Sequence, residues 1–113
     1  MSPVNTLKQC IMYKTQIFNL IVNKTAAECE VTPEEIRGTS HRSDIVDARC
    51  IAYQIAIKVE EFTPRDIAIA LGKGDNLKAI RELLASFEDR WNRSKLFRNI
   101  YNKVSKELNE ELL

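Results

Sequence analysis

The sequence is poor in the residues that metal sites, disulfide frameworks and tight turns require. Its 113 residues include one histidine, three cysteines, three glycines and three prolines. A single histidine excludes a histidine-based metal cluster. The cysteines form no Cys-x-x-Cys pair, so we expect neither a zinc site nor a disulfide framework. We expect them to be small hydrophobic residues inside the protein: Cys10, Cys29 and Cys50.

An excess of charge of one sign and long apolar runs are also missing. The formal net charge is +1, which argues against a strongly basic protein that coats nucleic acid but is compatible with a local basic face. No segment resembles a signal peptide or reaches the length of a membrane span, so we expect a cytoplasmic protein without a membrane partner. Hydrophobic residues make up 44% of the chain, enough for one core, and we expect a single domain over residues 1–113.

Residue patterns typical of catalysis are missing too. The sequence suggests no nucleophile–base pair and no two carboxylates placed for acid–base chemistry. It also lacks the Gly-x-x-x-x-Gly-Lys-Ser/Thr loop that binds nucleotide phosphates. We therefore expect no enzymatic activity, no ATPase and no cofactor.

Apolar residues instead recur at helical spacing along almost the whole chain. The pattern predicts an all-α protein, a compact bundle of about six helices. The expected helices cover Val4–Cys29, a short segment from Pro33 to Gly38, Asp44 to about Glu60, Thr63–Leu71, a segment from Asp75 that carries the apolar stripe to Trp91, and Ser94–Leu112. The residues expected to be largely buried are Ile45, Ala48, Ala52, Ile67, Leu71, Ile80, Leu84 and Trp91.

Capping residues mark the start of two of these helices. Thr32 can accept a hydrogen bond from the first helical turn, and Glu35 can reach back to complete a capping box. Thr63 and Asp66 repeat this arrangement, and a proline suits the first turn of both helices. Gly38 is expected to end the first of them.

The most specific local feature is the pair of helices around the Gly-Lys-Gly turn at residues 72–74. A short capped helix from Thr63 to Leu71 meets this turn, and Asp75 is a natural N-cap for the helix that follows. Such spacing is typical of a helix-turn-helix, whose second helix presents its N-terminal residues to the major groove of DNA. Helical bundles with other functions also join capped helices by short glycine turns, so the spacing alone leaves the function open.

Two stretches of the sequence resemble a known DNA-binding family. Residues 45–52 read Ile-Val-Asp-Ala-Arg-Cys-Ile-Ala, and residues 62–76 read Phe-Thr-Pro-Arg-Asp-Ile-Ala-Ile-Ala-Leu-Gly-Lys-Gly-Asp-Asn. They resemble the C-terminal DNA-binding domain (domain IV) of the bacterial chromosomal replication initiator DnaA. That family's pattern is Ile-Val-x-Ala-Arg-Gln-x-Ala, then Ser-Leu-x-x-Ile-Gly-x-x-Phe-Gly-Gly-Arg-Asp-His-Thr-Thr-Val. The resemblance implies a Trp-repressor-like helical fold, with a helix-turn-helix core at 21–87, an N-terminal helix extension at 1–20 and a C-terminal helix at 94–113.

The resemblance also implies a set of DNA-binding residues. Arg49 matches the family's helix arginine, which supports the DNA-facing loop or contacts the DNA backbone. Asp75 matches an aspartate of the segment that reads the bases. Asn76 stands where the family has histidine, and an asparagine can still pair with an adenine edge. The DNA-binding candidates are Arg42, Arg49, Lys73, Asp75, Asn76 and Lys78, with Arg65 and Arg81 as flanking phosphate contacts.

The base-reading segment departs from the family at several positions. Leu77 and Lys78 replace two threonines, and Gly74 replaces an arginine, although Lys73 keeps a positive charge one residue earlier. Arg42 is the main cation of a loop that is rich in Arg and Lys in the family. Phosphate contacts supply most non-specific affinity and base contacts supply specificity, so we expect weak binding or altered specificity.

Two functions therefore remain open from the sequence. The first is a small helix-turn-helix protein that binds double-stranded DNA. The second is a protein-interaction module that keeps the fold but has lost DNA binding, and that binds a protein partner or a second copy through its N-terminal or C-terminal helix. A continuous positive face over Arg42, Arg49 and Lys73 favours the first function, whereas a neutral or acidic face favours the second.

Overall fold

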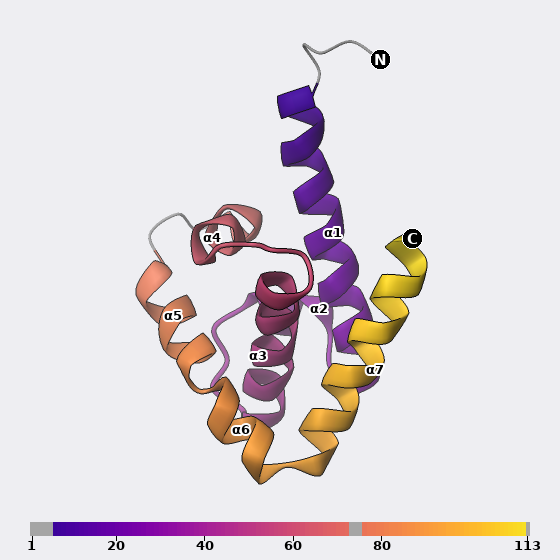
Figure 1. Ribbon diagram of the computed structural model, residues 1–113. Coiled ribbons are helices and arrows are strands. Elements are labelled where there is room, and N and C mark those ends of the chain that lie inside the picture. The colour runs from indigo at the N-terminus through magenta and orange to yellow at the C-terminus, as the bar shows by residue number, and fades with distance from the viewer. Residues whose placement is uncertain (1–5, 73–75, 113) are drawn as a thin grey trace.

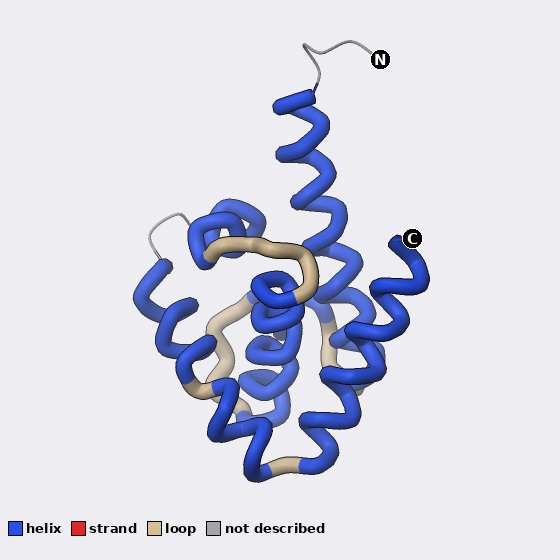
Figure 2. The backbone as a smooth tube through the Cα atoms, in the orientation of Figure 1, coloured by secondary structure: helices blue, strands red, loops and turns tan. Residues whose placement is uncertain are grey.

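The computed structural model describes residues 6–72 and 76–112, with side chains from residue 13 to residue 111 (Figure 1). This part of the chain forms seven α-helices and no strand (Figure 2). The prediction of an all-α bundle is therefore confirmed. The helices are α1 (Thr6–Cys29), α2 (Pro33–Arg37), α3 (Ser43–Lys58), α4 (Pro64–Leu71), α5 (Leu77–Ala85), α6 (Phe87–Arg93) and α7 (Lys95–Leu112).

Helix α3 forms the centre of the bundle, and every other helix packs against it. Helices α1 and α7 pack on each other along one side of α3, and α5 and α6 lie along the other side (Figure 1). Residues 48–56 of α3 are buried without interruption, as expected for a helix that is surrounded on all sides. Two polar side chains, Arg49 and Gln54, lie inside this buried stretch.

Both predicted capping boxes are present. The Thr32 hydroxyl accepts a hydrogen bond from the Glu35 N–H at 3.1 Å, and the Glu35 carboxylate accepts one from the Thr32 N–H at 2.9 Å. Thr63 and Asp66 form the same reciprocal pair, also at 3.1 and 2.9 Å. Each box satisfies two N–H groups that the first helical turn leaves without a partner, and it thereby sets where α2 and α4 begin.

Glycines end both of these short helices, in different conformations. Gly38 follows α2 with an extended backbone, as the C-cap of the helix. Gly72 follows α4 with a φ of +75°, in the left-handed region where a side chain would be strained. The Gly72 N–H closes the helix by donating to backbone carbonyls of its last turn. The chain can therefore leave α4 abruptly and start α5 within a few residues.

The helix expected to run from Asp75 to Trp91 is in fact two helices that meet at Ser86. The Ser86 hydroxyl donates to the Leu83 carbonyl at 2.6 Å, and the Ser86 N–H donates to the same carbonyl at 3.1 Å. Arg90 donates from Nε to the Ser86 hydroxyl at 2.9 Å. A serine hydroxyl that bonds to the preceding turn competes with the regular helical pattern. The prediction of a continuous helix was therefore wrong at Ser86.

Most of the predicted core residues are buried. Ile45, Ala48, Ala52, Ile67 and Ile80 are at most 2% exposed. The prediction was too strong for three others, which pack against the core but are only partly buried: Leu71, Leu84 and Trp91. Of the cysteines whose side chains are described, Cys50 is fully buried and Cys29 is partly buried.

Candidate nucleic-acid interface

Helices α4 and α5 carry or flank most of the residues that the sequence singles out. The two helices pack on each other, and α5 also packs on α3 (Figure 1). Ile80 anchors α5 in the core, and Leu77 is partly buried beside it. Two candidate contact residues of the connecting turn, Lys73 and Asp75, lie outside the described residues.

The outer side of α5 is polar and carries two cations. Lys78 and Arg81 are exposed, and so is Glu82, which places one acidic group on the same surface. Arg65 is exposed in the first turn of α4. Asn76 occupies the N-cap position of α5, where its side chain makes no capping hydrogen bond. The Asn76 carboxamide is therefore not needed to start the helix.

Arg42 is exposed, but its charge is compensated by neighbouring carboxylates. Its guanidinium donates to both oxygens of Asp44, at 2.7 and 3.1 Å, and lies 3.5 Å from a carboxylate oxygen of Glu35. The hydrogen bond to Asp44 raises the pKa of Arg42, and the same bond lowers the pKa of Asp44. A phosphate at this position would compete with two acidic side chains for the same cation.

Arg49 is buried and holds a loop in place. It donates from Nε to the Ile36 carbonyl at 2.7 Å, from Nη2 to the Glu35 carbonyl at 2.9 Å, and from Nη1 to the Ser40 carbonyl at 3.0 Å. These bonds join the end of α2 and the 38–41 segment to α3. Burial is the main effect that lowers the pKa of the guanidinium. Of the two roles that the resemblance implies for Arg49, these contacts correspond to support of the loop.

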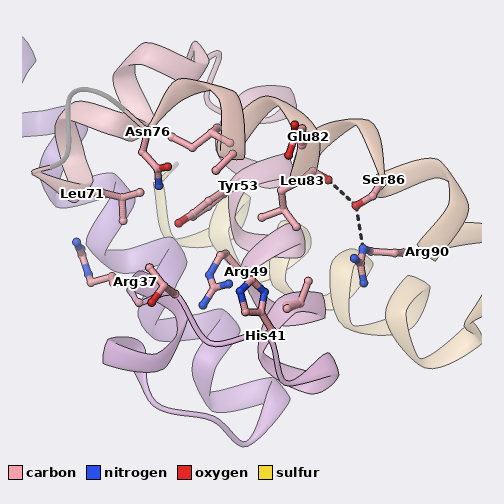
Figure 3. A pocket seen from close by; sticks show the side chains of 15 residues that line it. Arg37, His41, Arg49, Tyr53, Leu71, Asn76, Glu82, Leu83, Ser86 and Arg90 are labelled. Atoms are coloured by element: carbon pink, nitrogen blue, oxygen red, sulfur yellow. Dashed lines mark hydrogen bonds between the residues drawn. The ribbon is translucent and has the colours of Figure 1, made fainter.

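A groove that the sequence did not indicate lies between the 38–41 segment, α3 and α5, and we call it the loop groove. Its volume is about 510 Å³. Asn76 and Leu83 lie on one side, His41 lies on the other, and Tyr53 and Arg49 lie between them (Figure 3). Burial raises the pKa of Tyr53 to about 12, so its hydroxyl stays protonated at neutral pH. The groove therefore offers hydrogen-bonding groups beside a fixed positive charge.

The other cations that line the loop groove are also held by protein groups. Arg90 forms an ion pair with Asp47 at 2.7 Å, with only 22% of its side chain exposed. Arg37 donates to the Ala70 carbonyl at 3.4 Å and to the Asn19 side chain, and its guanidinium lies over the Phe18 ring. These partners lie far away in the sequence, so no local pattern could have revealed them.

The candidate set is therefore divided by the fold rather than gathered into one cationic patch. Lys78, Arg65 and Arg81 are exposed, Arg42 is compensated, and Arg49 is buried.

In the described ranges, no group of three His, Cys, Asp or Glu side chains is placed to hold a metal ion. None of the helices described there combines the length and apolar character needed to cross a membrane. No protein-family model matches the sequence, and no curated protein matches it either.

Proposed function

We propose that the protein is a small helix-turn-helix protein that binds double-stranded DNA through α5, weakly and mainly through phosphates. The observation that carries this proposal is the packing of α4 on α5 across a short turn, with Lys78 and Arg81 exposed on the outer side of α5. In a helix-turn-helix the second helix enters the major groove while the first crosses the backbone. The resemblance of residues 45–52 and 62–76 to the DnaA DNA-binding domain supports the same assignment.

The number of available cations sets the expected strength of binding. Among the described candidates, Arg65, Lys78 and Arg81 are exposed, whereas Arg42 is compensated by Asp44 and Glu35. Three phosphate contacts correspond to a slope of about −2.7 in log K against log salt, or a loss of affinity of about 40-fold between about 50 and 200 mM salt. We therefore expect DNA binding that is easily lost at moderate ionic strength.

A salt titration of binding to a fixed DNA duplex tests this proposal. Lys78→Ala and Arg81→Ala should each weaken binding to all sequences alike and reduce the salt slope by about one. Lys106→Ala removes an exposed cation of α7, on the other side of the bundle from α5, and serves as the matched control. Absence of binding to any duplex at low salt, or equal losses in all three variants, would contradict the assignment of α5 as the DNA-binding helix.

Asn76 is the residue that we propose reads a base. It lies at the start of α5, next to the expected path of the DNA, and its carboxamide makes no capping bond. A bidentate pair between asparagine and adenine provides about 1–3 kcal/mol of discrimination between bases. Selection from a random duplex library should therefore give a preferred site whose preference at one position disappears in Asn76→Ala, with folding stability unchanged. If the selected sites are the same for both proteins, Asn76 does not read a base.

A second candidate function, protein interaction or self-association, is favoured by the position of α1. The N-terminal turns of α1 extend beyond the rest of the bundle (Figure 1), and Tyr13 on this helix is 53% exposed. Sedimentation at increasing concentration tests self-association. This function predicts a concentration-dependent dimer that Tyr13→Asp weakens and that the control Asn23→Asp, at another exposed position of α1, leaves intact. A monomer at all concentrations would remove self-association from consideration.

A further inference from the structure

A second groove lies on the other side of α5 and α6 from the loop groove, and we call it the aromatic groove. Leu83 and Ser86 line the loop groove, whereas Leu84 and Phe87 line this one. Helices α5–α6 and α7 diverge from the turn that joins α6 to α7, and α3 lies between them (Figure 1). The volume of the aromatic groove is about 640 Å³, within the range of small-molecule sites.

Three aromatic rings form one wall of the aromatic groove. The ring centroid of Phe87 lies 5.6 Å from that of Trp91 and 5.2 Å from that of Tyr101, and Trp91 and Tyr101 meet edge to face at 5.5 Å. All three side chains line the groove and are partly exposed. Because the rings hold one another in place, this apolar surface exists before any ligand arrives.

Gln54 of α3 also lines the aromatic groove, and its carboxamide makes no hydrogen bond to any other described residue. The residue is only 8% exposed, but the amide oxygen and nitrogen are not sealed from solvent. Both atoms can therefore be reached by a molecule that enters the groove. The carboxamide therefore has both a donor and an acceptor available for a ligand in the groove.

The charges around the aromatic groove are balanced. Lys58 and Glu88 line it, both are exposed, and they carry opposite charges. The groove therefore favours neither an anion nor a cation, and a neutral ligand fits it better than a nucleotide or a carboxylic acid. Among the uncharged groups that line it, the Gln54 carboxamide offers a donor and an acceptor on separate atoms.

We propose that the aromatic groove binds a small, neutral, planar aromatic molecule that carries an amide-type edge, with an N–H donor beside a carbonyl acceptor. The ring packs against Phe87, Trp91 and Tyr101, where aromatic contacts add to the burial of apolar surface. The amide-type edge forms a reciprocal pair of hydrogen bonds with the Gln54 carboxamide. This site is separate from the proposed DNA-binding surface of α5 and does not depend on it.

Benzamide and N,N-dimethylbenzamide are a matched pair of probes for this site. Both have an aromatic ring and a carbonyl, but only benzamide has the N–H donor that the reciprocal pair with Gln54 needs. Trp91 is the only tryptophan of the chain, so its fluorescence and its indole N–H signal in NMR spectra report on the groove directly. We expect saturable binding of benzamide in the millimolar range, because so small a probe buries little surface, and binding of the dimethyl compound that is about tenfold weaker.

Gln54→Met tests the role of the carboxamide, because methionine keeps the length of the side chain and removes its hydrogen-bonding groups. The variant should bind benzamide about tenfold more weakly and should no longer distinguish the two probes. Gln16→Met, at an exposed position of α1, should bind like the original protein. The proposal is overturned if neither probe shifts the Trp91 signals saturably, or if the original protein binds both probes equally. The comparison of the two probes needs no variant, so it holds even if Gln54→Met fails to fold.

Discussion

The replacement of Arg49 by lysine tests whether this residue acts as a support of the fold. The guanidinium of Arg49 makes three hydrogen bonds to backbone carbonyls that lie 9, 13 and 14 residues away in the sequence. A lysine ammonium is a single point charge on a flexible chain, and it can replace one of these bonds but not the planar fork. Two hydrogen bonds from a charged group are then lost, each with a stabilising effect of about 1.5–3 kcal/mol.

Part of this loss is offset by water. The carbonyls of Glu35 and Ser40 lie nearer the surface than that of Ile36, so they can be rehydrated when the guanidinium is removed. We therefore expect Arg49→Lys to lower the free energy of unfolding by about 3 kcal/mol. With an unfolding entropy typical of this chain length, the melting temperature should fall by about 12 °C.

Urea unfolding followed by far-UV circular dichroism measures this loss of stability. Arg81→Lys, on the exposed surface of α5, is the matched control and should change the stability by less than about 0.5 kcal/mol. A variant Arg49→Lys that is as stable as the original protein but binds DNA more weakly would refute the support role and make Arg49 a direct DNA contact.

Three further predictions concern the buried and charged groups. Gln54→Met should change the free energy of unfolding by less than about 0.5 kcal/mol, because the carboxamide makes no hydrogen bond to a described residue and reaches solvent in the groove; a clear decrease in chemical denaturation would show that the amide is paired. Burial raises the pKa of the Cys50 thiol from 9.0 to about 11, so the folded state favours the protonated thiol and stability should fall by up to about 3 kcal/mol as the pH rises from 9.0 to about 11. Over the same pH range, the free energy of unfolding of Cys50→Ala should fall less than that of the original protein. Burial favours a higher pKa of Asp66, but hydrogen bonds from the Thr63 N–H and from Lys14 outweigh it and lower the pKa below its ordinary value of 3.8. The stabilisation that Asp66 provides is therefore present above pH 3.8 and is lost as the pH falls through the lowered pKa. In urea unfolding at a series of pH values, Asp66→Asn should lose less stability than the original protein as the pH falls.

The parts of the fold that were predicted correctly depend on short-range interactions. A capping box joins residues only three positions apart, so the pairs Thr32–Glu35 and Thr63–Asp66 could be predicted from the sequence alone. Gly38 and Gly72 likewise act on the helical turn immediately before them. The apolar periodicity predicted the helices because burial of a helix follows its own repeat of 3.6 residues.

The parts of the candidate site that could not be predicted depend on long-range contacts. Arg90 pairs with Asp47, which lies 43 residues earlier in the chain, and Arg37 reaches the Ala70 carbonyl across 33 residues. The break at Ser86 is an exception, because its hydrogen bonds join residues only three and four positions apart. It could not be predicted because the apolar stripe continues on both sides of it. Because its hydroxyl can bond either to the preceding turn or to a neighbour, only the arrangement of Leu83 and Arg90 decides the outcome.

By itself, the sequence determined that the described part of the chain is all-helical, where α2 and α4 begin, and that a helix ending at Gly72 is followed within a few residues by another. The tertiary structure decided what the polar residues of these helices do. It buried Arg49 against backbone carbonyls, paired Arg42 with carboxylates, and left the Gln54 carboxamide beside three aromatic rings with no hydrogen bond to another described residue. The physical reason is that helix formation depends on neighbours within a few residues, whereas the environment of a charge or an amide depends on which helices pack around it.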